Sequence, residues 1–345
     1  MNARFLKALG LRSPEAAVAG VLVAAALLIG TANPAFWGWG NLFGLLRSAS
    51  VEGIMALGVL VVLIAGGIDV SFPAFAAAAM YLSVRAVADW GWPGGIGLMF
   101  LLAAGIGLLL GLANALFVHG VRLVPLIVTL GTGAVVRGFL LGVVGTSVVN
   151  VGRMPPETVA FGRLSLLEWD TGEGRVQLSV AVLVWAAAAL GVHLLLRFTV
   201  PGRGLYALGG DAEAAKRVGF DVRGLTVLAY GLAGALAGVA GLLHACLAWQ
   251  ASPREFIGLE LDVLAAVVLG GASIFGGRGS VPGTVLGVLL LVLVNNSLIL
   301  LGVPTTWQRV VVGAILVGAA AATALRERGR RPAASITAPS ITAGT

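Results

Sequence analysis

Charged residues are scarce in this 345-residue sequence. They make up 11% of it, whereas hydrophobic residues make up 59%. A soluble domain usually carries about 25% charged residues, so this composition excludes a soluble globular protein. The apolar residues form solid blocks, and a membrane-spanning helix needs roughly 20 such residues. Because membrane β-barrel strands alternate apolar and polar residues instead, we predict an all-α polytopic membrane protein.

Cysteine, histidine and lysine are also rare. The one cysteine, Cys246, lies inside an apolar run and excludes an intrachain disulfide. The three histidines lack metal-ligand spacing, and no clustered catalytic set appears, which disfavours a metal site and a membrane-embedded enzyme. The two lysines, Lys7 and Lys216, do not follow the glycine-rich sequence of a nucleotide-binding loop. We expect that this chain binds no metal or cofactor and no ATP by that route.

Ten apolar segments divide the chain into spans and loops. They are residues 14–31, 45–66, 72–88, 95–118, 124–145, 179–197, 225–248, 259–274, 281–301 and 305–325. The transmembrane domain would therefore occupy residues 14–325. An N-terminal segment, residues 1–13, precedes it, and a tail, residues 326–345, follows with few large apolar groups, which predicts disorder.

The basic residues are distributed unequally between the two sides of these spans. If each segment crosses once, the side of the N-terminus holds fourteen basic residues and the other side holds four, Arg153, Arg163, Arg175 and Arg254. Cytoplasmic loops carry an excess of lysine and arginine, so we predict that both termini are cytoplasmic. This distribution explains the net charge of +7 without nucleic-acid binding. The outer loop over 146–178 is long enough to be functional.

A polar segment, GGDAEAAKRVG at residues 209–219, interrupts the apolar sequence within a cytoplasmic loop over 198–224. Its pattern predicts a short helix, because Asp211 is a good N-cap and Gly219 can adopt the left-handed conformation that ends a helix. Its charges match the helix dipole, with the acid near the N-terminus and the bases near the C-terminus. The charged residues of the helix are Glu213, Lys216 and Arg217.

One face of this predicted helix is small and apolar. Ala214, Ala215 and Val218 share it at helical spacing. Helices that lie on lipid headgroups usually carry bulky leucine, phenylalanine or tryptophan on this face. The small face is better suited to a groove in a partner protein, and an ordinary interfacial helix is the alternative.

Two glycine-rich motifs lie where predicted outward-to-inward spans end. One is GGID at residues 66–69 and the other is GGASIFGGRGS at residues 270–280. Glycine-rich backbone at membrane depth is tolerated only where protein or water surrounds it. The motifs are interpreted either as bends at a cytoplasmic gate or as tight interhelical turns, with the acid as a cap for the following helix. The candidate gate residues are Gly66, Gly67, Asp69, Gly270, Gly271, Gly276 and Gly277.

Polar groups within the spans are few. Asn114, Asn295 and Asn296 are candidates to line a solute pathway through hydrogen bonds to hydroxyl groups, or to hold helices together. Ionisable groups lie nearer a predicted span end than a centre, which disfavours an ion-coupled carrier with paired midplane charges. These ionisable residues are Arg47, Glu52, Arg85, Arg137 and Arg309.

Four stretches of the sequence, in order and spacing, resemble one family of membrane proteins. They are ALGVLVVLIAGGIDVSFPA (56–74), VPLIVTLGTGAVVRGF (124–139), GRGLYALGGDAEAAKRVGFDV (202–222) and LELDVLAAVVLGGASIFGGRGSVPGTVLG (259–287). The family is the ribose/xylose-type ABC sugar transporter permeases, the membrane subunits of bacterial binding-protein-dependent importers. The resemblance spans roughly residues 14–325. One departure is Phe72–Pro73, where the family commonly has glycine after its Asp–Leu–Ser sequence.

The resemblance implies a permease subunit that forms the pathway for a monosaccharide or similar small polar solute in the bacterial cytoplasmic (inner) membrane. ATP and Mg²⁺ would bind to separate cytoplasmic ATP-binding subunits that dock on the helix over 209–219. An extracytoplasmic solute-binding protein and a second permease copy or paralogue would complete the importer. A secondary ion-coupled transporter and a branched-chain amino-acid-type ABC permease are the alternatives.

Overall fold

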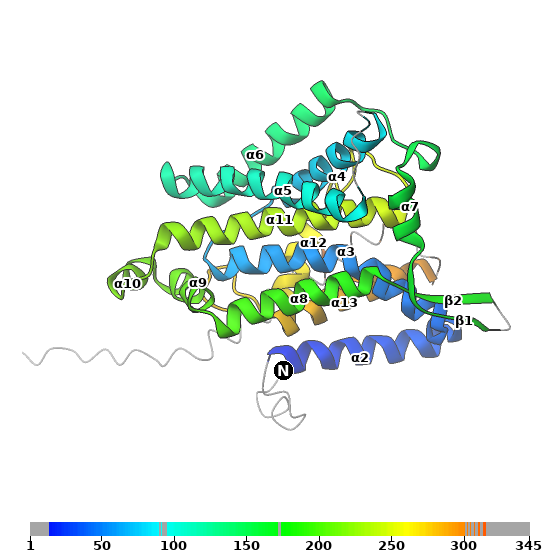
Figure 1. The fold of residues 1–345 in the computed structure, drawn as a ribbon. Helices are drawn as coiled ribbons and strands as arrows, with labels where there is room; N and C mark the ends of the chain where they lie inside the picture. The colour runs from blue at the N-terminus through cyan, green and yellow to red at the C-terminus, as the bar shows by residue number, and fades with distance from the viewer. Residues whose placement is uncertain are drawn as a thin grey trace, which may run out of the picture.

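Helices account for most of the described chain in the computed structural model (Figure 1). The structure describes residues 14–300 except 90, 92–94 and 172–173, together with 302, 304, 307, 310, 313 and 314. The α-helices are α2 (Pro14–Ala32), α3 (Trp39–Ile64), α4 (Phe72–Ala88), α5 (Ile96–Ala115), α6 (Pro125–Phe139), α7 (Pro156–Arg163), α8 (Ala181–Phe198), α9 (Val200–Gly210), α10 (Ala212–Arg217), α11 (Val222–Ala248), α12 (Leu259–Leu269) and α13 (Val281–Leu300). Between them lie the 3₁₀ turns η1 (Pro34–Trp37) and η4 (Val151–Arg153) and the π-helical turns η2 (Leu116–Gly120) and η3 (Leu140–Val144).

Seven of the described helices are long and apolar enough to cross a membrane. They are α2, α3, α5 continued by η2, α6 continued by η3, α8, α11 and α13. This finding confirms a polytopic α-helical membrane protein. It does not confirm ten spans, because α4 and α12 are shorter and the expected span over 305–325 lies largely outside the described residues.

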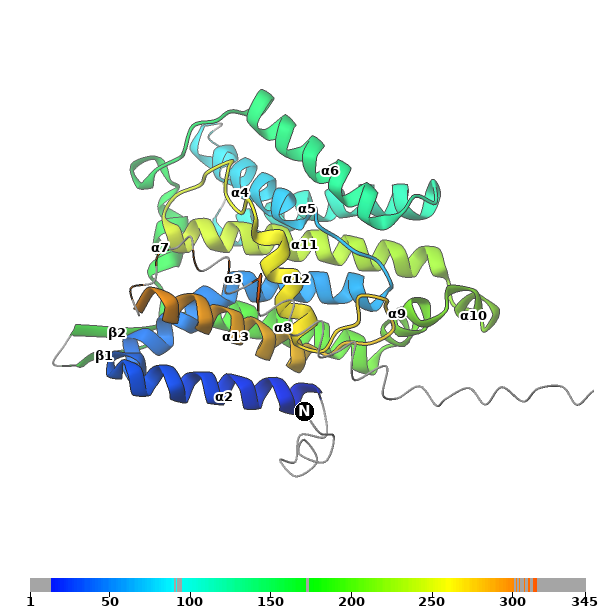
Figure 2. The ribbon, with the colours of Figure 1, turned by 180° about the vertical axis from the view of Figure 1, so that it is seen from behind.

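The two short helices follow the two long helices α3 and α11. An irregular segment, residues 67–71, leads into α4, and turns over residues 249–258 lead into α12, which crosses the face seen in Figure 2. A helix of 11 residues is about 16 Å long, against roughly 30 Å for the hydrocarbon core of a bilayer. The structure therefore does not confirm a helical span over 259–274, because turns at Gly270 and Gly271 end α12 after Leu269.

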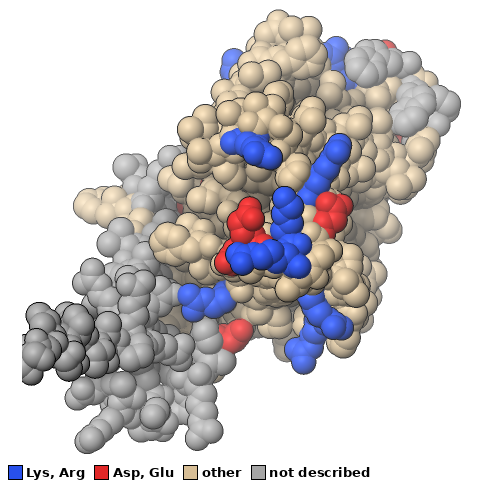
Figure 3. All heavy atoms as spheres, turned by 90° about the vertical axis from the view of Figure 1, so that its left-hand side faces the viewer, with Lys and Arg blue, Asp and Glu red and all other residues tan. Residues whose placement is uncertain are grey.

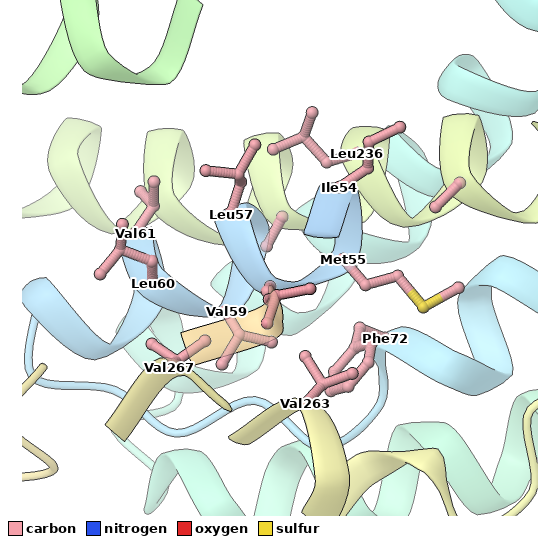
Figure 4. Packing of buried hydrophobic residues seen from close by; sticks show 14 of the residues in the cluster. Ile54, Met55, Leu57, Val59, Leu60, Val61, Phe72, Leu236, Val263 and Val267 are labelled. Atoms are coloured by element: carbon pink, nitrogen blue, oxygen red, sulfur yellow. The ribbon is translucent and has the colours of Figure 1, made fainter. Parts of the chain in front are cut away.

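The core lies along α3 and α11, which run side by side through the bundle (Figure 1). In Figure 4, fully buried side chains of α3, such as Ile54 and Leu57, lie toward α11, while Val263 of α12 faces the other side of α3. Small residues bring α5 close to α11, since a Cβ on Gly234 would lie 2.1 Å from the carbonyl oxygen of Gly107. This packing joins α3, α5, α11 and α12 in the core of the bundle.

The segment over 146–178, which the sequence predicts as an outer loop, contains more regular structure than a loop. After α7 it forms an antiparallel hairpin of β1 (Ser165–Thr171) and β2 (Gly174–Ser179). Trp169 of β1 packs edge-on against Phe43 of α3, with ring centroids 5.4 Å apart. This hairpin corrects the all-α prediction locally. The strands have only seven and six residues, so their alternation of apolar and polar side chains is too short to be recognised among long apolar segments.

Candidate functional site

The polar segment over 209–219 forms α10 and its caps. The Asp211 carboxylate accepts hydrogen bonds from the backbone N–H groups of Glu213 (2.9 Å) and Ala214 (3.0 Å). Gly219 has φ +92°, and its N–H donates to the carbonyl oxygen of Lys216 (3.1 Å). Both ends of this six-residue helix are therefore satisfied by its own sequence, which gives it a defined shape outside the bundle.

The side chains of α10 divide into one that faces the chain and several that face outward. Ala215 is buried, whereas Ala214, Lys216, Arg217 and Val218 are exposed. The predicted small face is thus split, because Ala215 packs inside its own chain. Figure 1 shows α10 projecting from one end of the bundle, and Figure 3 shows basic and acidic side chains gathered on that end.

Backbone from three distant segments meets directly beside α10. We call the contact of Gly66, Gly209, Gly210, Gly276 and Gly277 the glycine junction. A Cβ on Gly209 would lie 1.9 Å from the carbonyl oxygen of Ile64 and 2.6 Å from the Gly277 nitrogen. A Cβ on Gly276 would lie 2.8 Å from the Gly66 Cα. The end of α3, the end of α9 and the loop before α13 are therefore in backbone contact.

Hydrogen bonds join the same three segments. The Gly277 N–H donates to the carbonyl oxygen of Ile64 (3.0 Å), at the end of α3. The Tyr206 hydroxyl of α9 donates to the carbonyl oxygen of Gly279 (2.9 Å). Burial raises the pKa of Tyr206. The structure thus brings together the expected gate motifs and the lead-in to α10, which the sequence treats as separate features.

The remaining candidate gate glycines have other neighbours. A Cβ on Gly270 would lie 2.3 Å from the carbonyl oxygen of Gly283, so this residue packs against the start of α13. Gly271 has φ +95°, which explains the glycine after α12. A Cβ on Gly67 would lie 2.5 Å from the hydroxyl oxygen of Tyr230. Of the six candidate gate glycines, only Gly66, Gly276 and Gly277 belong to the glycine junction.

Asp69 belongs to a buried polar network at the start of α4. Its carboxylate accepts hydrogen bonds from the Ser71 N–H (2.8 Å) and from the Ser71 hydroxyl (2.5 Å). The Asn114 amide of α5 donates to the Ser71 hydroxyl oxygen (2.8 Å) and accepts from the hydroxyl of Thr132 in α6 (2.6 Å). The network therefore ties α4, α5 and α6 together where the irregular segment after α3 enters the bundle.

The three asparagines proposed from the sequence lie in different places. Asn114 is buried in the network, while Asn295 and Asn296 lie on α13 and are half-buried. The Asn296 amide oxygen is buried and has no hydrogen-bond partner among the described residues. Sequence reasoning did not select Ser71, although it directly follows the GGIDV sequence, nor Tyr206, which lies in the quoted GRGLYALGG sequence.

α7 and the hairpin lie at the end of the molecule opposite α10 (Figure 1). A polar cavity of about 530 Å³ lies there among α3, α7, the hairpin and the end of α11. The Arg47 guanidinium donates to the carbonyl oxygen of Leu247 (2.7 Å), and Arg163 lies over the ring of Trp249 at 5.1 Å. Arg175 pairs with Glu168 at the same cavity. Three guanidinium groups against one carboxylate give the cavity an excess of positive charge.

Comparisons with known proteins agree over most of the chain. The family whose model matches residues 41–320 is described as branched-chain amino acid transport system / permease component. The chain is 34% identical to the ribose import permease protein RbsC of Escherichia coli (strain K12), over 84% of this chain and 87% of that protein. It is 33% identical to the autoinducer 2 import system permease protein LsrD of Klebsiella pneumoniae, over 88% and 89%. It is 30% identical to the xylose transport system permease protein XylH of Haemophilus influenzae, over 80% and 87%. No solved structure matches the chain.

Proposed function

The chain belongs to the branched-chain amino acid transport system permease family, and we propose that it forms the pathway of an ABC importer for a monosaccharide or similar small polar solute. It is a membrane permease subunit and not an enzyme. The observation that carries the proposed cargo is the similarity to ribose and xylose permeases over at least four fifths of both chains. In this proposal, ATP and Mg²⁺ bind to separate subunits.

The proposed setting is the bacterial inner membrane, with α10 in the cytoplasm. The unequal distribution of basic residues supports this orientation. A solute-binding protein would then dock at the end that carries the hairpin, where the basic cavity beside Arg163 and Arg175 offers charge complementarity to an acidic surface. A second permease copy or paralogue would complete the pathway.

The proposed mechanism passes the motion of the ATPase from α10 to the end of α3. α10 is capped at both ends and is connected to α9 through the single residue Asp211, so it would move together with Gly209. The glycine junction leaves no gap between Gly209 and the carbonyl oxygen of Ile64. A displacement of α10 would therefore shift the GGID segment, where the pathway is proposed to open and close.

Branched-chain amino acids are the second candidate cargo, because the matching family is described by them. The ribose and xylose permeases among the relatives favour a polyhydroxylated solute. Competition for uptake separates these candidates. Unlabelled ribose or xylose should reduce uptake of a labelled sugar, whereas inhibition by leucine alone would assign the chain to amino-acid transport.

Reconstituted vesicles test the proposed function directly. We expect accumulation of solute when this chain is combined with its ATP-binding subunit, its binding protein and ATP. Charge reversal at Lys216 and Arg217 should leave ATP hydrolysis in place and reduce uptake, because both exposed side chains lie on α10. Vesicles that hold this chain alone provide the control. If they accumulate solute under an ion gradient without ATP, the chain is a secondary transporter and the proposal fails.

A further inference from the structure

The two most exposed large apolar side chains among the described residues lie close to α10. Phe275 is 88% exposed, well above any large apolar side chain on the described spans, and Val218 is 73% exposed. Val218 directly follows the last residue of α10. Phe275 precedes Gly276, which contacts Gly209 in the glycine junction. Two residues far apart in the sequence thus present apolar groups beside the same short helix.

Phe275 lies at the tip of a hydrogen-bonded turn. Its N–H donates to the Ser273 hydroxyl oxygen (3.2 Å), and the Gly276 N–H donates to the Ser273 carbonyl oxygen (3.2 Å). The Ser273 N–H in turn donates to the carbonyl oxygen of Arg278 (2.9 Å). These bonds fix the turn, and the glycine junction fixes its base against α9. The backbone that carries the exposed ring is therefore held in a defined position.

The surroundings of these two side chains are polar. Lys216 and Arg217 are exposed immediately before Val218, and Figure 3 shows charged groups spread over this end of the molecule. Contact with water is unfavourable for a large apolar side chain relative to burial. Exposed apolar groups bordered by charges are the arrangement of an interface, in which a few apolar anchors lie inside a polar rim.

We propose that the Phe275 turn is a second docking element for the ATP-binding subunit, which would cover Phe275 and Val218 together with α10. This inference rests on the proposed function, because it concerns the same partner. The partner is favoured by position, since the turn lies at the end of the bundle that the basic residues mark as cytoplasmic. It is also favoured by continuity, since the glycine junction joins the turn to α10.

Two-point contact has a mechanical consequence. A partner attached to α10 alone could rotate the helix about its own connections. A partner that also holds the Phe275 turn would move both backbone segments that contact Gly66 at the end of α3. These segments are the end of α9 at Gly209 and the turn at Gly276. The turn therefore determines how completely a movement of the ATPase reaches the GGID segment.

The test is retention of the ATP-binding subunit by the full-length tagged chain in detergent. Phe275→Ala should weaken binding at least about tenfold, as expected for loss of an aromatic anchor. Phe198→Ala is the matched control, because Phe198 is 63% exposed at the end of α8 and outside the glycine junction. Equal retention by the Phe275 variant, the Phe198 variant and the wild type would overturn the inference.

A photoreactive benzophenone side chain at position 275 gives an independent result. A crosslink to the ATP-binding subunit supports the inference, whereas a crosslink to a second permease copy or to lipid overturns it. Failure of the proposed function can be distinguished from failure of this inference. If the proposed function fails, the wild-type chain itself retains no ATP-binding subunit. If charge reversal on α10 abolishes retention while Phe275→Ala does not, the proposed function stands and the second docking element is rejected.

Discussion

Replacing Gly209 with alanine should separate the contribution of the glycine junction from that of the helix in which this residue lies. Gly209 and Gly210 are the last two residues of α9, and neither has a positive φ. In a helix, alanine is favoured over glycine by up to about 1 kcal/mol. Local propensity alone therefore predicts that alanine at either position stabilises the protein.

The surroundings of the two glycines differ. A Cβ on Gly209 would lie 1.9 Å from the carbonyl oxygen of Ile64, so the end of α3 must move by about 1 Å or more. A Cβ on Gly210 would meet nothing within 4 Å. Overpacking of this kind costs about 1–3 kcal/mol, and loss of the hydrogen bond from Gly277 to Ile64 adds roughly 1 kcal/mol. We expect Gly209→Ala to be less stable than Gly210→Ala by about 2–4 kcal/mol, because the gain in helix propensity is the same in both variants.

The two variants should also differ in transport. Gly209→Ala separates α9 from the end of α3, so it should lower the amount of solute moved per ATP hydrolysed. Gly210→Ala keeps the contact and should transport like the wild type. Thermal unfolding in detergent measures the stability difference, and uptake together with ATP hydrolysis in vesicles measures the coupling. Equal stability and equal coupling of the two variants would refute the reasoning.

Three further substitutions test other parts of the structure. Ala214→Pro removes a backbone N–H that caps α10 and should uncouple ATP hydrolysis from uptake, so normal uptake by this variant contradicts the coupling role. Asn114→Leu breaks hydrogen bonds to α4 and α6 and should lower the free energy of unfolding by roughly 1–3 kcal/mol, measured by thermal unfolding. The Arg85 guanidinium holds the pKa of Asp89 below its usual value. This pair therefore stabilises the folded state above about pH 3.9, the unfolded-state pKa. The stabilisation is lost as the pH falls through the lower pKa of the folded state. Asp89→Asn should remove this acid-dependent part, about 1 kcal/mol or less, and an unchanged pH profile of unfolding would argue against it.

The sequence alone predicts those features whose structure depends on residues close together along the chain. The helix over 212–217 forms with Asp211 as its N-cap and Gly219 at positive φ, because these preferences act over a few residues. Long apolar segments likewise became long helices. The short α12 was not predicted, since hydropathy counts apolar residues through 274 and does not register the turn that begins at Gly270.

The glycine junction could not be derived in this way, because its parts are more than sixty residues apart along the chain. Each pair of glycines, considered alone, is equally compatible with a flexible turn. The structure gives a different reason for Gly209, which lies in a helix with no positive φ and faces backbone atoms of two other segments. Glycine is required there by proximity and not by conformational freedom. A sequence can therefore contain both α10 and the proposed gate as recognisable motifs, while the contact that connects them becomes evident only when the three segments are placed in space.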